Sequence, residues 1–101
     1  MVLIVEFEEV AKNELFDAIE WYEKKQTGLG EQLYGEFTDV LELVKLHPKA
    51  FVRFSQNTRK AFLFRFPYYV IYSTEENVLT ILAFFHSQQD DEKLKNRVSD
   101  S

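Results

Sequence analysis

The stretch Arg59–Tyr72 constrains the fold more than any other part of this sequence, because it is aromatic, alternating and interrupted by a proline. In an extended strand successive side chains point to opposite faces. Alternation therefore predicts two faces, one with Phe62, Phe64 and Phe66 and the other with Arg59, Ala61, Leu63 and Arg65. We expect the phenylalanines to face the core. Pro67 has no N–H to donate, so the run predicts two strands joined at a tight turn near it.

The composition is that of one packed domain. The 101 residues are 46% hydrophobic and 29% charged, with three glycines and two prolines. A chain of this length buries about 65% of its unfolded surface, which suffices for one modest core over residues 1–101. The polar segment 87–101 is predicted to be a mobile tail. No apolar stretch approaches the roughly 20 residues of a membrane span, so we expect a cytoplasmic protein.

Charge is distributed unevenly along the chain, whose net charge is −5. Residues 1–50 hold five Lys and Arg against eleven Asp and Glu, whereas residues 51–101 hold seven against six. Residues 51–66 contain four basic side chains and no acid. An anionic partner should therefore meet the strands, and the acids of the helices are interpreted as solvated faces.

Two helices are predicted from apolar residues at offsets of 0, 4, 7, 8 and 11, which form one helical face. These residues are Ala11, Leu15, Ala18, Ile19 and Tyr22 in the first helix, and Leu33, Phe37, Val40, Leu41 and Val44 in the second. Gln26–Gly30 forms the turn between them, and Pro48 ends the second helix. So short a connection predicts an antiparallel helical hairpin with an apolar face to cover.

Strands are predicted on either side of this hairpin. The apolar run Val2–Phe7 suggests a strand covered on both faces. Tyr68–Ser73 and Val78–Phe85 flank a hairpin loop at 74–77, and Leu94 with Val98 gives a weak stripe on a last helix, 91–98. The fold class is therefore α+β, in the order β-α-α-β-β-β with an optional C-terminal helix. The sheet is twisted and mostly antiparallel, with the helical hairpin on one face and the other face partly open.

The strand cations Arg59, Lys60 and Arg65 are candidates for an anion-binding surface. Arginine binds phosphate or carboxylate through two N–H groups, and Tyr68 and Tyr72 could stack on a base or pack against a partner. The alternative is that these are solvated charges on an exposed strand face. His86, at the end of an apolar strand, is either a structural residue or a catalyst.

Other kinds of site find no support in the sequence. The two histidines lie far apart, no carboxylate is spaced with either, and there is no cysteine. Gly28–Gly30 lacks the third glycine and the preceding strand of a phosphate-binding loop. We therefore predict neither a metal nor a cofactor.

The order of several motifs resembles the RelE/ParE family of toxins from bacterial type II toxin–antitoxin pairs, nearer the ParE (plasmid stabilization) branch. The motifs are Arg65-Phe66-Pro67-Tyr68, an acidic turn, Phe85-His86, Ala18–Tyr22 and Gly28–Gly30, and the resemblance spans residues 9–97. It implies the topology derived above. For the ParE branch it also implies a toxin that binds DNA gyrase and is neutralised by an antitoxin, whose C-terminal segment lies across the sheet and helices.

The resemblance to RelE implies an alternative, a ribosome-dependent and metal-independent mRNA endonuclease. His86 would then be a general acid or base, Arg65 would stabilise the phosphate, and Tyr68 would lie beside it. However, Gln89 stands where the family usually has arginine, and Asp91 stands where proline is common. A neutral amide with two carboxylates beside it makes RNA cleavage the less favoured activity. A third alternative is a non-toxic member that keeps antitoxin binding, with Gln89 among the partner-facing residues.

Overall fold

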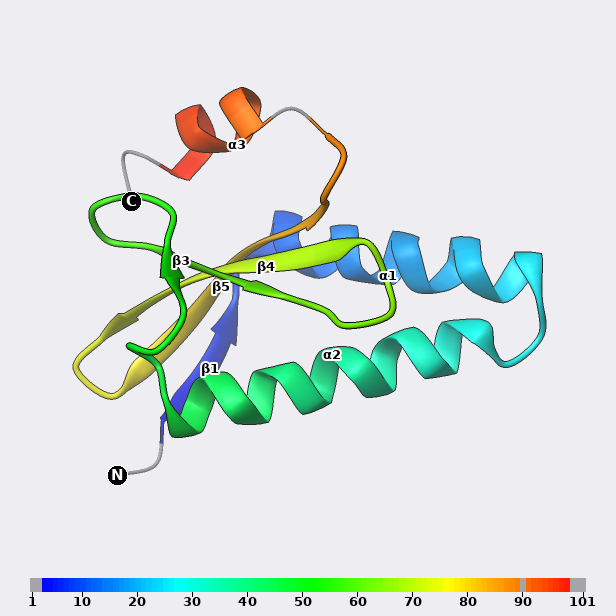
Figure 1. Ribbon diagram of the computed structural model, residues 1–101, viewed down its shortest axis with the longest axis horizontal. Coiled ribbons are helices and arrows are strands. Elements are labelled where there is room, and N and C mark those ends of the chain that lie inside the picture. Colours follow the sequence, from blue (N-terminus) through cyan, green and yellow to red (C-terminus); the bar gives the residue numbers. More distant parts are fainter. Residues whose placement is uncertain (1–2, 90, 99–101) are drawn as a thin grey trace.

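The computed structural model describes residues 3–89 and 91–98, and it confirms the α+β class (Figure 1). A helical hairpin lies along one face of a five-stranded sheet, and a short helix lies on the other. The elements in chain order are β1 Ile4–Phe7, α1 Glu9–Lys25, α2 Leu29–Leu46, β2 Val52–Arg53, β3 Arg59–Phe62, β4 Tyr68–Glu75, β5 Val78–His86 and α3 Asp91–Val98. None of the helices in the described ranges has the length and apolar character that a membrane crossing needs.

The sheet has the order β1-β5-β4-β3-β2. β1 pairs in parallel with β5, and the other neighbours are antiparallel. The expectation that β1 is covered on both faces is wrong, because it lies at the edge: Ile4 is 53% exposed and Phe7 37%. Val2, part of the expected strand, lies outside the described residues.

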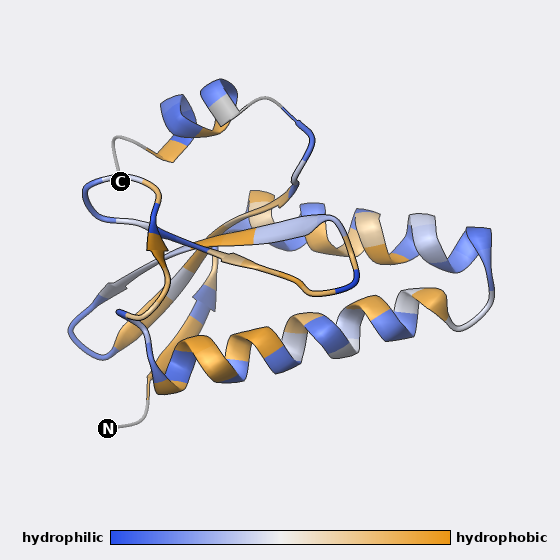
Figure 2. Cartoon of the chain, in the orientation of Figure 1, coloured by the Kyte–Doolittle hydropathy of each residue, from blue (hydrophilic) through white to orange (hydrophobic). Residues whose placement is uncertain are grey.

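The two helical faces pack as the periodicity predicts. Ala11, Leu15 and Ala18 of α1 join Leu33, Phe37, Val40 and Val44 of α2 in the core that these helices form with the sheet. Figure 2 shows orange apolar residues along the sides of the helices that face the strands. The turn between the helices is shorter than expected, with Gly28 at a φ of +92°. The Glu23 carboxylate accepts the N–H groups of Gly28 and Gly30, which supplies the acceptor that the start of α2 lacks.

The expected faces of the β3 run are wrong. Ala61 and Leu63 are buried, whereas Phe62 is 51% exposed and Phe64 75%. Ala61 lies opposite Val70 in the ladder, on the side covered by the helical hairpin, so its neighbour Phe62 faces the other way. β3 ends at Phe62, and the alternation of buried and exposed side chains continues only to Phe64. It breaks at Arg65, so Phe66 is buried in the core from the turn around Pro67.

The β4–β5 hairpin turns at Glu76 and Asn77, two residues rather than the expected four. Glu76 takes a φ of +57°, the sign that tight hairpin turns favour. The ladder pairs Tyr68 with His86, so both residues lie at the same end of the sheet.

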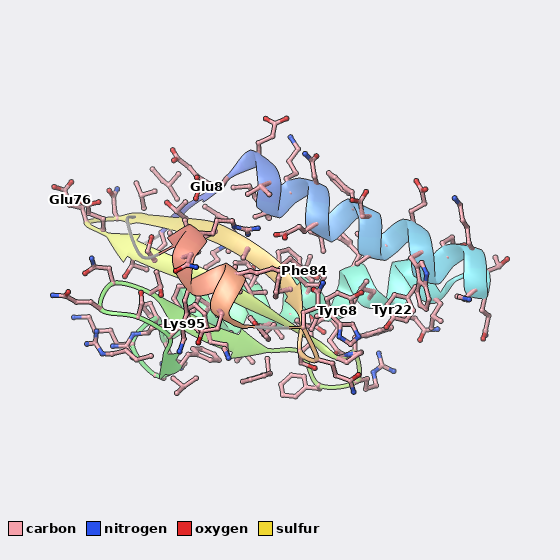
Figure 3. All side chains as sticks on the ribbon, turned by 90° about the horizontal axis from the view of Figure 1, so that it is seen from above. Glu8, Tyr22, Tyr68, Glu76, Phe84 and Lys95 are labelled. Atoms are coloured by element: carbon pink, nitrogen blue, oxygen red, sulfur yellow. The ribbon has the colours of Figure 1, made fainter. Side chains whose placement is uncertain are left out.

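The C-terminal helix α3 is present and covers part of the face that was expected to be open. Leu94 and Val98 are buried against Tyr69, Ile71, Leu82 and Ala83. Arg97 binds the Glu14 carboxylate at 3.0 Å and donates to the Leu82 carbonyl at 2.9 Å. These contacts anchor α3 to the sheet and to α1. Figure 3 looks down on α3 lying over the strands. The mobility of residues 87–101 stays a prediction, and residues 90 and 99–101 lie outside the described part.

Candidate functional site

The structure separates the residues that the sequence grouped into one cationic surface. Tyr68, His86 and Gln89 line one hollow, Arg59 and Tyr72 line a second, and Arg65 lies beside Tyr68 in a third. Lys60 lies on the sheet face that carries α3, with its ammonium 4.4 Å from the Tyr69 ring centre. The structure therefore does not bring the three cations onto one surface. Lys60 points to the opposite face of β3 from Arg59, and Arg65 lies in the turn beyond the end of the strand.

The first hollow, which we call the aromatic groove, lies between α1 and the end of the β4–β5 ladder (Figure 3). It measures about 470 Å³ and is lined by Glu14, Asp17, Ala18, Trp21, Tyr22, Tyr68, Phe84, Phe85, His86 and Gln89. Tyr68 is its centre: its ring stacks on Phe84 at 4.8 Å, meets His86 edge-on at 5.0 Å and lies 6.2 Å from Tyr22. Such interlocked rings form a rigid apolar floor.

The aromatic groove has no lysine or arginine in its lining. Glu14 is paired with Arg97, while Asp17 makes no ion pair with any described residue. Burial raises the pKa of the Tyr22 hydroxyl, and burial together with Tyr22 raises the pKa of Tyr68, so both phenols are neutral at physiological pH. The groove is therefore aromatic and mildly acidic.

His86 is half-buried at the end of β5, and its imidazole is held by its own turn. Its Nδ1 accepts the N–H of Gln88 at 3.1 Å, and its backbone N–H donates to the Gln89 side-chain oxygen at 3.4 Å. Gln89 thus closes the turn that carries the histidine. The sequence analysis used the carboxylates of Asp90 and Asp91 as an argument against RNA cleavage, but these two side chains lie outside the part that the structure describes.

Arg65 is neutralised by a helical acid, Glu36. The Glu36 carboxylate accepts the Arg65 backbone N–H at 2.6 Å, the Arg65 Nε–H at 3.0 Å and the Phe66 N–H at 3.4 Å. Burial alone would raise the pKa of Glu36, but these donors outweigh it and hold the pKa below its ordinary value. The interpretation of every helical acid as solvated is wrong here: Glu36 is 6% exposed because it binds the turn around Pro67.

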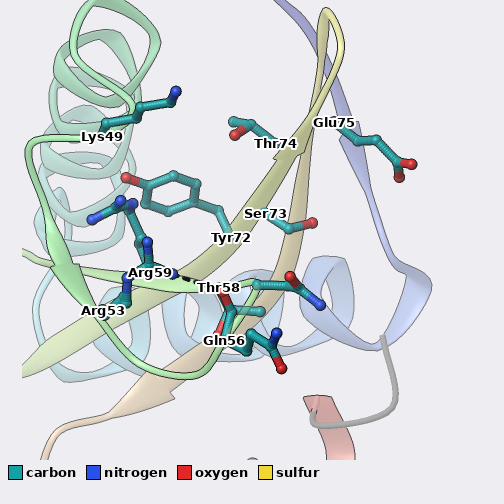
Figure 4. A pocket seen from close by; sticks show the side chains of 10 residues that line it. Lys49, Arg53, Gln56, Thr58, Arg59, Tyr72, Ser73, Thr74 and Glu75 are labelled. Carbon is teal, nitrogen blue, oxygen red and sulfur yellow. Dashed lines mark hydrogen bonds between the residues drawn. The ribbon is translucent and has the colours of Figure 1, made fainter.

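The second hollow, which we call the basic pocket, is formed by the loop after α2, β2, β3 and β4 (Figure 4). Its lining is Lys49, Arg53, Gln56, Asn57, Thr58, Arg59, Tyr72, Ser73, Thr74 and Glu75. Tyr72 is 1% exposed and donates its hydroxyl to the Pro48 carbonyl at 2.6 Å, so the expectation that it stacks on a partner is wrong. Burial raises its pKa to about 12, although the Arg59 charge acts in the opposite direction.

Sequence reasoning missed Trp21, Lys49 and Glu36 as site residues. Trp21 is 53% exposed at the rim of the aromatic groove. The sequence did carry a signal for it, because a large apolar residue on the polar side of a helix often marks a binding surface. Nothing in the pattern pointed to Glu36, whose partner Arg65 lies 29 positions later. Among the described residues no group of three His, Cys, Asp or Glu could hold a metal ion.

The helical hairpin on one face of a five-stranded sheet places this chain in a class of α+β fold that has a solved counterpart. A chain titled "Chromosomal ParDE TA system from P. aeruginosa" shares the fold, with a TM-score of 0.63 at 15% identity, over 86% of this chain and 98% of that one.

A family model described as "ParE toxin of type II toxin-antitoxin system, parDE" matches residues 5–91, and the chain belongs to this family. Toxin ParE2 of two Mycobacterium tuberculosis strains, CDC 1551/Oshkosh and ATCC 25618/H37Rv, is 28% identical over 89 residues, 87% of this chain and 85% of each relative. The resemblance to the ParE branch is confirmed. A toxin of a type II system is paired with an antitoxin protein, so the family implies that partner.

Proposed function

We propose that this ParE-family toxin acts in the cytoplasm by binding a protein target, DNA gyrase, and not by cleaving RNA. The observation that carries the proposal is the lining of the aromatic groove around His86: among the described residues it includes Glu14 and Asp17 but no lysine or arginine. A scissile phosphate gains negative charge in the transition state and needs fixed positive groups beside it. The groove offers aromatic rings and a carboxylate instead.

Two of the three groups that the RelE-like alternative would use already take part in hydrogen bonds. The Arg65 Nε–H is given to Glu36, and the His86 Nδ1 accepts the Gln88 N–H. Gln89 adds no charge where the family usually carries arginine. In an endonuclease built from His86, Arg65 and Tyr68, the Glu36 carboxylate would offset part of the positive charge that Arg65 offers to a phosphate.

The antitoxin, on this proposal, lays its C-terminal segment in the aromatic groove. Trp21 is 53% exposed, lies 4.9 Å from the Tyr22 ring and forms the rim. Exposed aromatic residues next to a rigid apolar floor are typical energetic centres of protein interfaces. Asp17, unpaired among the described residues, favours a partner segment with a basic side chain between apolar ones.

The activity is tested with purified chain in two assays, gyrase supercoiling and mRNA cleavage on translating ribosomes. We expect inhibition of supercoiling and no cleavage. Codon-specific cleavage that His86→Ala abolishes would overturn the proposal in favour of the endonuclease. Inactivity in both assays, with antitoxin binding retained, would identify a non-toxic member of the family.

The groove is tested by the affinity for the antitoxin encoded beside the gene, measured by calorimetry. Trp21→Ala should weaken binding by about 30-fold or more, the size of effect expected from an aromatic interface centre. Phe16→Ala is a matched control, since Phe16 is also 53% exposed on α1 but lies outside the groove. Equal losses in both variants would mean that the antitoxin does not use the groove.

A further inference from the structure

The basic pocket is separate from the aromatic groove and shares no residue with it. It measures about 550 Å³ and lies on the hairpin side of the sheet, beyond the C-terminal end of α2. Three cations line it, Lys49, Arg53 and Arg59, against one carboxylate, Glu75. In a protein with a net charge of −5, this is a local concentration of positive charge inside a concave surface.

The two arginines of the basic pocket are held in place without being neutralised. Arg59 Nη1 donates to the Phe51 carbonyl at 2.7 Å, and Arg53 Nη1 donates to the Gln56 carbonyl at 2.7 Å. A carbonyl fixes a guanidinium but leaves its charge, and each guanidinium has five N–H donors. The ion pairs between described residues include none of the three cations. Arg59 is half-buried, and a half-buried cation without a counter-charge is costly unless an anion binds there.

The remaining lining suits an oxyanion. Thr74 brings a hydroxyl group from β4, and Gln56 and Asn57 bring amides from the turn before β3. Figure 4 shows the Arg59 guanidinium beside the Tyr72 hydroxyl, and Glu75 pointing away from the cations. The cavity falls within the 300–1,000 Å³ typical of small-molecule sites, about enough for a di- or triphosphate and its sugar.

We propose that the basic pocket binds a small, multiply charged phosphate compound, such as the triphosphate group of a nucleotide. Recognition is independent of the base, because the one aromatic residue in the lining, Tyr72, is 1% exposed and offers no face for stacking. A long nucleic acid is disfavoured, since the lining charges lie in one hollow and the chain as a whole is acidic. The proposal does not depend on the target of the toxin.

The test is calorimetric titration of the purified chain with tripolyphosphate at low salt. We expect one site with a dissociation constant below about 1 mM, weakened by added salt. Lys49→Gln and Arg53→Gln should each weaken binding about tenfold, the value of one charge-assisted contact. Glu75→Gln should strengthen it. Lys49 is exposed, and its side chain takes part in no hydrogen bond or ion pair with another described residue, so its variant keeps the test independent of folding.

Lys12→Gln is the matched control, because it removes the same charge from an exposed site on α1 that lines none of the hollows described above. It should bind tripolyphosphate like the parent chain. ATP, GTP and CTP should agree within about threefold, whereas a single-stranded 12-nucleotide DNA should bind more weakly than tripolyphosphate. The proposal is overturned by absent binding, by an effect of Lys12→Gln equal to that of Lys49→Gln, by strong base preference, or by tighter binding of the DNA.

Discussion

Replacing Glu36 by alanine should destabilise the protein far more than replacing its ion-pair partner Arg65. Glu36 is buried and binds the turn around Pro67 through two backbone N–H groups, whereas the Arg65 side chain is 68% exposed. The ion pair itself is therefore solvated and contributes under about 1 kcal/mol. The backbone contacts are the larger part of the interaction.

The magnitude follows from the donors that the alanine variant would leave behind. A buried N–H without an acceptor costs about 1–3 kcal/mol, and the shorter of the two bonds, to the Arg65 N–H, is 2.6 Å. With the weaker Phe66 contact, Glu36→Ala should lower the free energy of unfolding by about 3 kcal/mol. Arg65→Ala should lower it by under about 1 kcal/mol. Urea unfolding of the two variants and the parent chain measures both values.

The effect of Glu36 should also depend on pH. Its folded pKa lies below the ordinary value of 4.5, so its contribution is present above the unfolded pKa and is lost as pH falls through the folded one. The stability difference between the parent chain and Glu36→Gln should therefore shrink below about pH 4.5. Equal costs for Glu36→Ala and Arg65→Ala, or a difference that does not change with pH, would refute the reasoning.

Three further outcomes are expected. Gly30→Ala should destabilise the folded protein by about 1–3 kcal/mol in thermal unfolding, because the added Cβ would lie 2.6 Å from a carbonyl oxygen of α1. Gly35→Ala is the control: a Cβ at Gly35 would have no atom within 4 Å, so this variant should be as stable as the parent chain or more stable. Tyr72 should ionise near pH 12 in an absorbance titration that compares the parent chain with Tyr72→Phe. The substitution should also remove the part of the alkaline destabilisation that sets in above about pH 10, the unfolded pKa of tyrosine. Leu94→Ala should speed amide exchange in α3 by at least about tenfold and leave β4 protected, since it removes a buried anchor of that helix alone. Unchanged exchange in α3 would contradict that role.

Local periodicity was sufficient to predict every element except β2, Val52–Arg53, which has only two residues and is too short to show a period. The apolar offsets placed both helices of the hairpin, and the strands on either side of Pro67 and Glu76 follow from alternation and turn residues. Even the weak pair Leu94 and Val98 marked a helix that forms. These features depend on residues within a few positions of one another, because the helical and strand periods determine which nearby side chains share a face.

The candidate site could be predicted only in part. Tyr68, His86 and Gln89 do meet in one groove, because the ladder places Tyr68 opposite His86 and the following turn brings Gln89 back. The cations Arg59, Lys60 and Arg65 lie at different places in the structure. Alternation could not show which face of β3 packs against the helical hairpin. Helices cover both faces of this sheet, so apolar residues on either side look alike in sequence.

The sequence alone determined which segments coil and which extend, and the order of motifs that marks the ParE family. The tertiary structure decided which charges are neutralised and which are left in a pocket: Glu36 meets Arg65 from 29 positions away, and Glu14 meets Arg97 from 83. The physical reason is that a side chain's direction is set by its local backbone, whereas its partner is set by strand register and helix packing. Those depend on the whole chain at once.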